Sequence, residues 1–288
     1  MRASGNRKIF DFIIFSNIFI ALCALLMAMY TTRLFALNIP PSNFLFFLFF
    51  STLASYSIHW YLTDETTEIT AARTAWLARN KTTHFAFFII STIGSGVFLL
   101  QEWSYIKWIL PAIFLTVMYT APKFPFKPFL ALKKLIWGKT ILLSLMWTYI
   151  TSLLPFFIIN AGWKESYFIF FLNRFTLIFP ICILFDLRDK DFDKATGVKS
   201  LVTLLPHPKI KKIFFLLTVI NLLTIPLLAQ FVNFSIADKF ILLIPTVLTF
   251  LLYSTASKTK NDYLFYFILD GLMALSPILY FLKGCLAA

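Results

Sequence analysis

Long apolar segments, separated by short polar connections, follow one another along the whole chain. An apolar segment of about 20 residues is long enough to cross the roughly 30 Å hydrocarbon core of a bilayer as a helix. The pattern predicts nine such helices, at residues 9–30, 43–63, 84–101, 103–121, 136–159, 166–186, 210–232, 236–256 and 263–283. We therefore expect a single all-α polytopic membrane domain that occupies residues 1–288.

Composition and charge agree with a membrane protein. Hydrophobic residues make up 59% of the 288 residues and charged residues only 14%, whereas about a quarter of an ordinary soluble domain is charged. Most of the 26 Lys and Arg residues fall on the side of the predicted bundle that holds the amino terminus. The positive-inside rule then predicts a cytoplasmic amino terminus and a carboxyl terminus on the opposite side. The net charge of +13 also favours contact with anionic membrane lipids, and we expect no nucleic-acid partner because no soluble basic motif is present.

An acidic run, D-L-R-D-K-D-F-D-K-A-T-G-V-K-S at residues 186–200, directly follows a predicted helix. If that helix continues, Asp189 and Asp193 lie one turn apart on the same face, and Asp186 lies one turn before them. Such carboxylates repel one another unless a cation lies between them. Mg²⁺ is held by one or two carboxylates together with waters and phosphate oxygens, so an acidic face without His or Cys fits Mg²⁺ better than zinc.

Residues 189–200 follow the pattern D-x-x-x-D-x-x-x-G-x-K-S, in which Gly197 permits a turn out of the helix and Lys199 offers a positive charge to a diphosphate. This pattern resembles the second aspartate-rich motif of the UbiA superfamily of intramembrane prenyltransferases. The resemblance implies a helical bundle around a central cavity that opens toward the cytoplasm, with motif loops at about 60–83, 119–139 and 186–209. It also implies an enzyme in which Mg²⁺ ions hold a polyprenyl diphosphate while the prenyl group passes to an aromatic or other lipophilic acceptor.

The first acidic motif of that family, N-D-x-x-D-x-x-x-D after the second helix, is altered in this chain. The segment W-Y-L-T-D-E-T-T-E at residues 60–68 keeps two acids four residues apart, Asp64 and Glu68, but has Trp and Tyr where the family has Asn-Asp. Arg73 follows at a position where family members often carry Arg-Thr. By resemblance, the catalytic residues are Asp189, Asp193, Asp64, Glu68 and Arg73, and the metal ligands are Asp189, Asp193, Asp64, Glu68 and Asp186. The alternative for Asp64 and Glu68 is a helix cap with solvated acids.

Other positions resemble the diphosphate site of the family. Asn17 is an isolated polar residue in an apolar helix, and such residues usually face the bundle interior. Tyr119 and Lys123 follow the Tyr-x-x-x-Lys pattern of the family's connection between helices 4 and 5, although an interfacial aromatic and a topological lysine are equal alternatives. Further lysines in this connection are Lys127, Lys133, Lys134 and Lys139, and the sequence does not separate catalytic from topological lysines. The resemblance assigns the diphosphate to Lys199, Lys123, Tyr119, Asn17 and Arg188.

Two charged residues, Arg174 and Asp270, fall inside predicted helices. An unpaired charge at the bilayer centre costs about 2.5 to 3.5 kcal/mol, so both side chains are expected to face the interior and to have partners. We expect them to pair with each other, with a role of Asp270 as a base toward the acceptor as the alternative. Prolines within several helices, Pro155 and Pro245 among them, predict kinks around a cavity.

Two other functions stay open at this point. The altered residues 60 and 61 of the first motif also fit a family member that binds isoprenoid or quinone-like lipids without transferring them. The intramembrane charges fit a transporter, although the sequence has no evident internal repeat. Magnesium-dependent diphosphate binding would separate the prenyltransferase and the lipid-binding protein from the transporter. Turnover would then separate the prenyltransferase from the lipid-binding protein.

Overall fold

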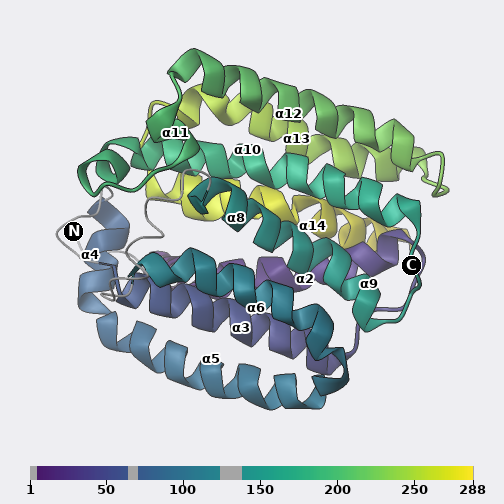
Figure 1. The fold of residues 1–288 in the computed structure, drawn as a ribbon, viewed down its shortest axis with the longest axis horizontal. Coiled ribbons are helices and arrows are strands. Elements are labelled where there is room, and N and C mark those ends of the chain that lie inside the picture. Colours follow the sequence, from purple (N-terminus) through teal and green to yellow (C-terminus); the bar gives the residue numbers. More distant parts are fainter. Residues whose placement is uncertain (1–4, 64–70, 124–137, 288) are drawn as a thin grey trace.

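The protein is a bundle of long helices that run roughly along one common axis, with short connections at the two ends (Figure 1). The computed structural model describes residues 5–63, 71–123 and 138–287, and every regular element in these ranges is helical. The α-helices are α1 (Gly5–Phe15), α2 (Ile18–Leu34), α3 (Ser42–Tyr61), α4 (Ala71–Arg79), α5 (Lys81–Gln101), α6 (Ile106–Thr120), α8 (Gly138–Thr148), α9 (Leu154–Ile158), α10 (Glu165–Ala195), α11 (Leu201–Leu204), α12 (His207–Leu228), α13 (Ile236–Ala256) and α14 (Asp270–Ala287). π-Helices at Tyr149–Leu153 and Leu264–Leu269 connect α8 to α9 and lead into α14.

Seven of the described helices are long and apolar enough to cross a membrane, or eight if the bent pair of α1 and α2 counts as one span. The chain is therefore an α-helical multi-pass membrane protein, but the number falls short of the nine spans predicted. The predicted span 103–121 corresponds to α6, which has 15 residues and at 1.5 Å per residue covers about 22 Å, less than the hydrocarbon thickness. Short 3₁₀ turns, Trp103–Tyr105 and Ala121–Lys123, occupy both ends of this segment in place of α-helix.

The first predicted span, residues 9–30, is broken. Helices α1 and α2 meet at an angle of 63°, and Asn17 between them has a φ of 70°. This left-handed conformation interrupts an α-helix, and asparagine tolerates it better than most residues with a side chain. The break turns the chain and leaves the Asn17 side chain in the interior, only 2% exposed.

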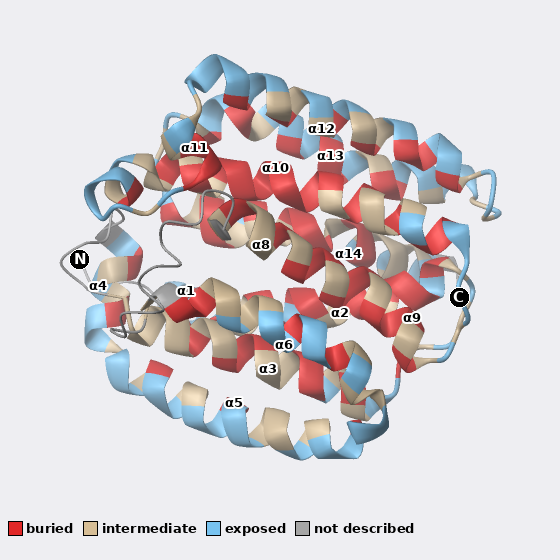
Figure 2. Ribbon diagram, in the orientation of Figure 1, coloured by how far each residue is buried: buried red, intermediate tan, exposed pale blue. Residues whose placement is uncertain are grey.

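Helix α10 is the central element of the bundle. Most of its side chains are buried, whereas the buried residues of the outer helix α5 are His84 and Ser91 (Figure 2). With 31 residues, α10 is about 46 Å long and exceeds the thickness of the hydrocarbon core. Asp186 lies about 31 Å along the helix from Glu165, so the acidic run begins where the membrane-spanning length of α10 is complete.

Arg174 does not pair with Asp270, so this prediction is wrong. The Arg174 Nη1 donates to the carbonyl oxygens of Thr151 at 2.7 Å and of Met27 at 3.2 Å. The Thr151 carbonyl lacks its usual helical donor because Pro155, four residues later, has no N–H. Backbone oxygens of two neighbouring helical segments therefore stabilise the guanidinium charge, and no carboxylate is required.

Replacement of Arg174 by leucine is expected to destabilise the protein by about 2 kcal/mol, because the buried oxygens of Thr151, Met27 and Thr31 lose a charged donor. The Thr31 hydroxyl still donates to the Thr151 carbonyl, which limits the loss. Thermal unfolding of the purified protein in detergent measures the effect. Arg33, which is exposed at the end of α2, provides the matched control, and Arg33→Leu should change stability by less than about 0.5 kcal/mol. Equal unfolding midpoints for the two variants would contradict a structural role of Arg174.

A second proline also produces a contact between helices. Pro245 leaves the carbonyl of Ile241, four residues earlier in α13, without a helical donor. The Ser276 Oγ of α14 donates to this oxygen at 2.7 Å, as expected for transmembrane helices in which a neighbouring side chain replaces the lost hydrogen bond. The intramembrane prolines therefore create sites for cross-helix hydrogen bonds.

Candidate functional site

A cavity of about 440 Å³ lies among α3, α6, α8, α10 and the start of α14. Its lining includes every predicted site residue that the structure describes: Asn17, Arg73, Tyr119, Lys123, Asp186, Arg188, Asp189, Asp193 and Lys199. Asp64 and Glu68 lie outside the described residues. One cavity therefore brings together at least one described residue from each of the three connections that were expected to carry the motifs: Arg73, Lys123 and Lys199.

Three aspartates of α10 share one face of the helix, as their spacing predicts, and they surround one ammonium group. The Lys139 Nζ, from the first turn of α8, lies 2.9 Å from Asp193 Oδ2 and 3.1 Å from Asp193 Oδ1. It also lies 3.4 Å from Asp189 Oδ2 and 3.5 Å from Asp186 Oδ1. A cation does lie between the carboxylates, and in this structure it is a lysine of the same chain.

The remaining oxygens of two carboxylates have partners on neighbouring residues. The Thr140 Oγ1 donates to Asp186 Oδ2, and the Arg188 Nε donates to Asp189 Oδ1 at 2.7 Å. Helix α10 ends shortly afterwards at Ala195, and Gly197 adopts a φ of 71°. This left-handed conformation confirms the predicted turn at the glycine, because other residues adopt it only with strain.

Arg73 is held between two aromatic rings beside the carboxylates. Its guanidinium carbon lies 3.7 Å from the ring centroid of Trp60 and 3.9 Å from that of Tyr266, distances at which the π faces attract a cation. Its Nη2 donates to Asn17 Oδ1 at 3.0 Å. Arg73 is only 2% exposed, so the aromatic rings and the Asn17 amide fix a buried positive charge at the cavity wall.

Asp262 positions the backbone that carries Arg73. Its Oδ2 accepts from the backbone N–H groups of Ala72 at 3.1 Å and Arg73 at 2.9 Å. These N–H groups belong to the first turn of α4, where no helical acceptor is available. Asp262 therefore caps α4 from a distant part of the chain and couples the start of the last helical segment to Arg73.

Replacement of Asp262 by alanine is expected to destabilise the protein by about 1 kcal/mol, the typical cost of a lost helix cap. Asp262→Asn keeps an acceptor oxygen in the same place and should retain most of the stability. Thermal unfolding midpoints of the two variants test this, and equal losses in both would show that charge, and not capping, accounts for the effect of Asp262.

Arg188 presents a second buried guanidinium to the cavity. It is 7% exposed, and its carbon lies 4.6 Å from the ring centroid of Phe265 and 4.9 Å from that of Tyr266. Whereas Nε is bound to Asp189, the buried Nη1 has no hydrogen-bond partner among the described residues. A buried charged donor without a partner is costly, so this N–H group is a strong candidate for contact with an anionic ligand.

Further polar residues lie at the side of the cavity formed by α3 and α6. The Tyr119 ring stacks on the His59 ring with their centroids 5.5 Å apart and an interplanar angle of 12°. The Lys123 Nζ donates to the Thr63 Oγ1 at 3.0 Å. The predicted Tyr-x-x-x-Lys pair therefore lines the same cavity as the aspartates, and the His59 ring packs against its tyrosine.

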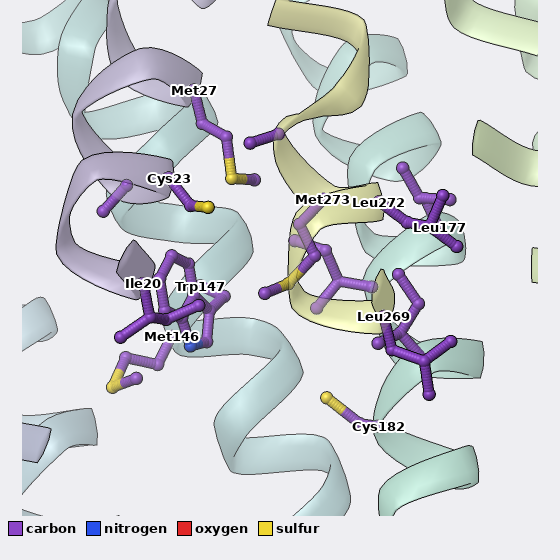
Figure 3. Packing of buried hydrophobic residues seen from close by; sticks show 14 of the residues in the cluster. Ile20, Cys23, Met27, Met146, Trp147, Leu177, Cys182, Leu269, Leu272 and Met273 are labelled. Atoms are coloured by element: carbon purple, nitrogen blue, oxygen red, sulfur yellow. The ribbon is translucent and has the colours of Figure 1, made fainter. Parts of the chain in front are cut away.

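The inner part of the cavity is apolar. Side chains of Ile20, Met146, Trp147, Cys182 and Met273 line it, and Figure 3 shows these residues converging from α2, α8, α10 and α14. The Trp147 Nε1 donates to the Tyr56 hydroxyl at 3.0 Å, which satisfies the indole. Polar groups at one end and hydrocarbon and sulfur at the other give the cavity the character of an amphiphile site.

Asp270 was expected to pair with Arg174, but it lines the cavity instead. It has no hydrogen-bond or ion-pair partner among the residues that the structure describes. Arg73 and Arg188 line the same cavity, so Asp270 on α14 shares it with two guanidinium groups. Asp270 is therefore available to a ligand.

Sequence reasoning missed several residues of this site. Lys139 was one of five lysines in one connection, and only the rotation of α8 against α10 distinguishes it. Trp60 was noted as a departure from a motif, although it supplies the ring that covers Arg73. Tyr266 and Asp262 carried no sequence signal, because their roles depend on contacts with residues almost 200 positions earlier.

The donor set of this site is compatible with magnesium. Within residues 5–63, 71–123 and 138–287, no three His, Cys, Asp or Glu side chains form a metal-site arrangement. Magnesium, however, commonly uses only one or two carboxylates and completes its octahedron with waters and phosphate oxygens. The oxygens of Asp189 and Asp193 converge on one point, that of the Lys139 Nζ, so they could bind one hard cation if the lysine moved.

Comparison with known proteins adds no relative. The chain matches no protein-family model, no curated protein and no solved structure. The fold and the cavity define an α-helical multi-pass membrane protein with an amphipathic cavity in its described part.

Proposed function

We propose that the protein is a prenyltransferase of the UbiA type, which transfers a prenyl group from a polyprenyl diphosphate to an aromatic or other lipophilic acceptor within the membrane. The observation that carries this proposal is the arrangement of the cavity. Three aspartates and the buried guanidinium groups of Arg73 and Arg188 lie at one end, and an apolar chamber lies at the other. An isoprenoid diphosphate has the same division between an anionic head and an apolar tail.

The residues divide into head and tail contacts. Arg188 Nη1, Arg73, Lys123 and Lys199 supply positive charge to the diphosphate, and Tyr119 supplies a phenol group. Magnesium held by Asp189 and Asp193, with Asp64 and Glu68 as the second pair, would neutralise the leaving diphosphate when bound. The prenyl chain would extend along the apolar cavity residues that Figure 3 labels, Ile20, Met146, Trp147, Cys182 and Met273. The cavity would open toward the cytoplasm.

The reaction exchanges one bond for another. The allylic carbon–oxygen bond breaks, and its electron pair leaves with the diphosphate, which the cationic side chains stabilise. The acceptor then donates an electron pair to the allylic carbon and forms the new bond. The acceptor loses one proton, and Asp270 is placed to receive it, because its carboxylate lines the cavity without a hydrogen-bond partner among the described residues.

A second candidate function is the binding of an isoprenoid or quinone-like lipid without transfer. Two observations favour it: Lys139 fills the space between the carboxylates, and Trp60 takes the place of a polar residue of the family motif and covers Arg73. Both arrangements would hold an anionic lipid head without a complete set of metal ligands. Transport has weaker support, because Arg174 binds backbone carbonyls instead of pairing with Asp270.

The test is turnover by the purified protein in nanodiscs. Magnesium, a series of labelled polyprenyl diphosphates of increasing length and a panel of aromatic and lipid acceptors are supplied, and pyrophosphate release and prenylated product are measured. Magnesium-dependent release coupled to product formation is expected. Tight diphosphate binding without release for any acceptor would favour the binding protein, and absence of both binding and release would refute the prenyltransferase proposal.

A further inference from the structure

The acidic face of α10 already holds a cation that belongs to the protein. The Lys139 ammonium contacts both carboxylate oxygens of Asp193 and one oxygen each of Asp189 and Asp186, all within 3.5 Å. We propose that Lys139 is the resident counter-cation of these three aspartates and competes directly with divalent metal ions for them. This inference deepens the proposed function, because it concerns the same site, but it makes a statement about metal binding alone.

The carboxylate oxygens of this cluster are already occupied without a metal ion. Lys139 contacts four of them, Thr140 Oγ1 occupies the second oxygen of Asp186, and Arg188 Nε occupies the second oxygen of Asp189. Three negative charges thus face the two positive charges of Lys139 and Arg188. The cluster carries one net negative charge, and each of its six carboxylate oxygens has a polar partner. A preformed metal site, in contrast, holds carboxylate oxygens that have no partner until the ion binds.

A divalent ion and the Lys139 ammonium cannot occupy this position together. Magnesium binds oxygen at about 2.0 to 2.1 Å, and the Nζ lies 2.9 Å from Asp193 Oδ2, so an ion bound to Asp193 would lie within repulsive distance of a positive charge. Lys139 is 24% exposed and has a flexible stem, which allows it to move into the cavity. There it would join the unpartnered Nη1 of Arg188 as a second donor to an anion.

Competition makes a specific prediction for metal affinity. Mn²⁺ serves as the probe, because electron paramagnetic resonance can follow its binding. The full-length protein is measured in nanodiscs of neutral lipid, and no diphosphate is added. Lys139→Met should bind Mn²⁺ at least 10-fold more tightly than the wild type. Lys139→Arg, which keeps the charge, should stay within about threefold of the wild type. Lys194→Met removes an exposed charge of α10 that does not line the cavity, and it should also stay within about threefold.

A second measurement uses the wild type only and does not depend on the stability of a variant. Acetylation of lysines is quantified by mass spectrometry as Mn²⁺ is added. The reactivity of Lys139 should rise several-fold as the metal displaces it from the aspartates, whereas that of Lys194, which is exposed on α10, should stay constant.

Unchanged Mn²⁺ affinity in Lys139→Met, together with unchanged Lys139 reactivity, would overturn the inference. Affinity gains of equal size in Lys139→Met and Lys194→Met would also overturn it, because the effect would then come from the overall positive charge of this end of the bundle. No prenyl substrate is present in either experiment. If Lys139 and Mn²⁺ compete but the turnover assay shows no product, only the transferase proposal is refuted. If product forms but Lys139 and Mn²⁺ do not compete, only the role of Lys139 is refuted.

Discussion

Replacement of Asp189 and Asp193 together by asparagine is expected to lower kcat/KM for the prenyl diphosphate by about 1,000-fold, or about 4 kcal/mol of transition-state stabilisation. The two carboxylates are the side chains of α10 that converge with Asp186 on one cation position. Asparagine keeps the size of each side chain but removes the charge that would hold magnesium. Pyrophosphate release at saturating acceptor and varied magnesium measures the loss.

The matched control for this double variant is Asp191→Asn on the same helix. Asp191 is exposed and does not line the cavity, so its replacement should leave kcat/KM within about twofold, as for most surface substitutions. Thermal unfolding midpoints show whether the double variant keeps its fold. Equal rates for the double variant and Asp191→Asn would remove the aspartates of α10 from the mechanism.

Replacement of Arg188 by methionine is expected to weaken magnesium-dependent binding of inorganic pyrophosphate by about 30-fold, or about 2 kcal/mol, as for a hydrogen bond to a charged group. The Arg188 Nη1 is buried at the cavity wall without a partner among the described residues. Arg188→Lys keeps the charge but loses the planar fork, and an intermediate affinity is expected. Isothermal titration calorimetry measures all three proteins.

A control for general charge effects comes from Lys194→Met. Lys194 lies on α10 and is exposed, so its removal changes the net charge by the same amount as Arg188→Met without a change in the cavity. Its pyrophosphate affinity should lie within about threefold of the wild type. If both variants lost affinity equally, the anion would be attracted by the overall charge of this end of the bundle, and Arg188 would have no specific role.

Local sequence patterns predicted the features of the site that depend on one helix. The spacing of Asp186, Asp189 and Asp193 requires a common face once the helix continues, and α10 does continue to Ala195. The turn at Gly197 was predicted because few other residues adopt a positive φ without strain. The class of α-helical multi-pass membrane protein followed from hydropathy, since an apolar helix satisfies its own backbone hydrogen bonds in lipid, but the number of nine spans did not.

Features that depend on the packing of one helix against another were not predictable in this way. Arg174 was expected to need a carboxylate, but Pro155 frees a carbonyl that no pattern marks as an acceptor until the helices are assembled. Lys139 could not be distinguished from the other lysines near it, because its contact with α10 depends on the rotation of α8. The break at Asn17 was hidden inside a continuous apolar run, where hydropathy shows no sign of a change in direction.

The segment that resembles the first UbiA motif departs from it at Trp60, and the contacts of this residue give the departure a physical explanation. Trp60 stands where the family pattern has a polar residue, and its ring lies 3.7 Å from the guanidinium carbon of Arg73. The rings of Trp60 and Tyr266 add cation–π attraction to the hydrogen bond that Arg73 donates to Asn17 Oδ1. The departure from the motif therefore removes a polar group and at the same time holds a positive charge at the cavity wall, where an anionic head would require it.

The central claim is that the charged end of the cavity binds a prenyl diphosphate head while the apolar end receives its chain. Photoaffinity labelling tests it most directly, with a prenyl diphosphate analogue that carries a diazirine at the end of the chain, magnesium, and the protein in nanodiscs. The account predicts cross-links to the inner wall, at Met146, Trp147, Cys182 or Met273, that inorganic pyrophosphate with magnesium suppresses. Cross-links confined to the lipid-exposed faces of α5 and α12, or insensitive to pyrophosphate, would contradict it.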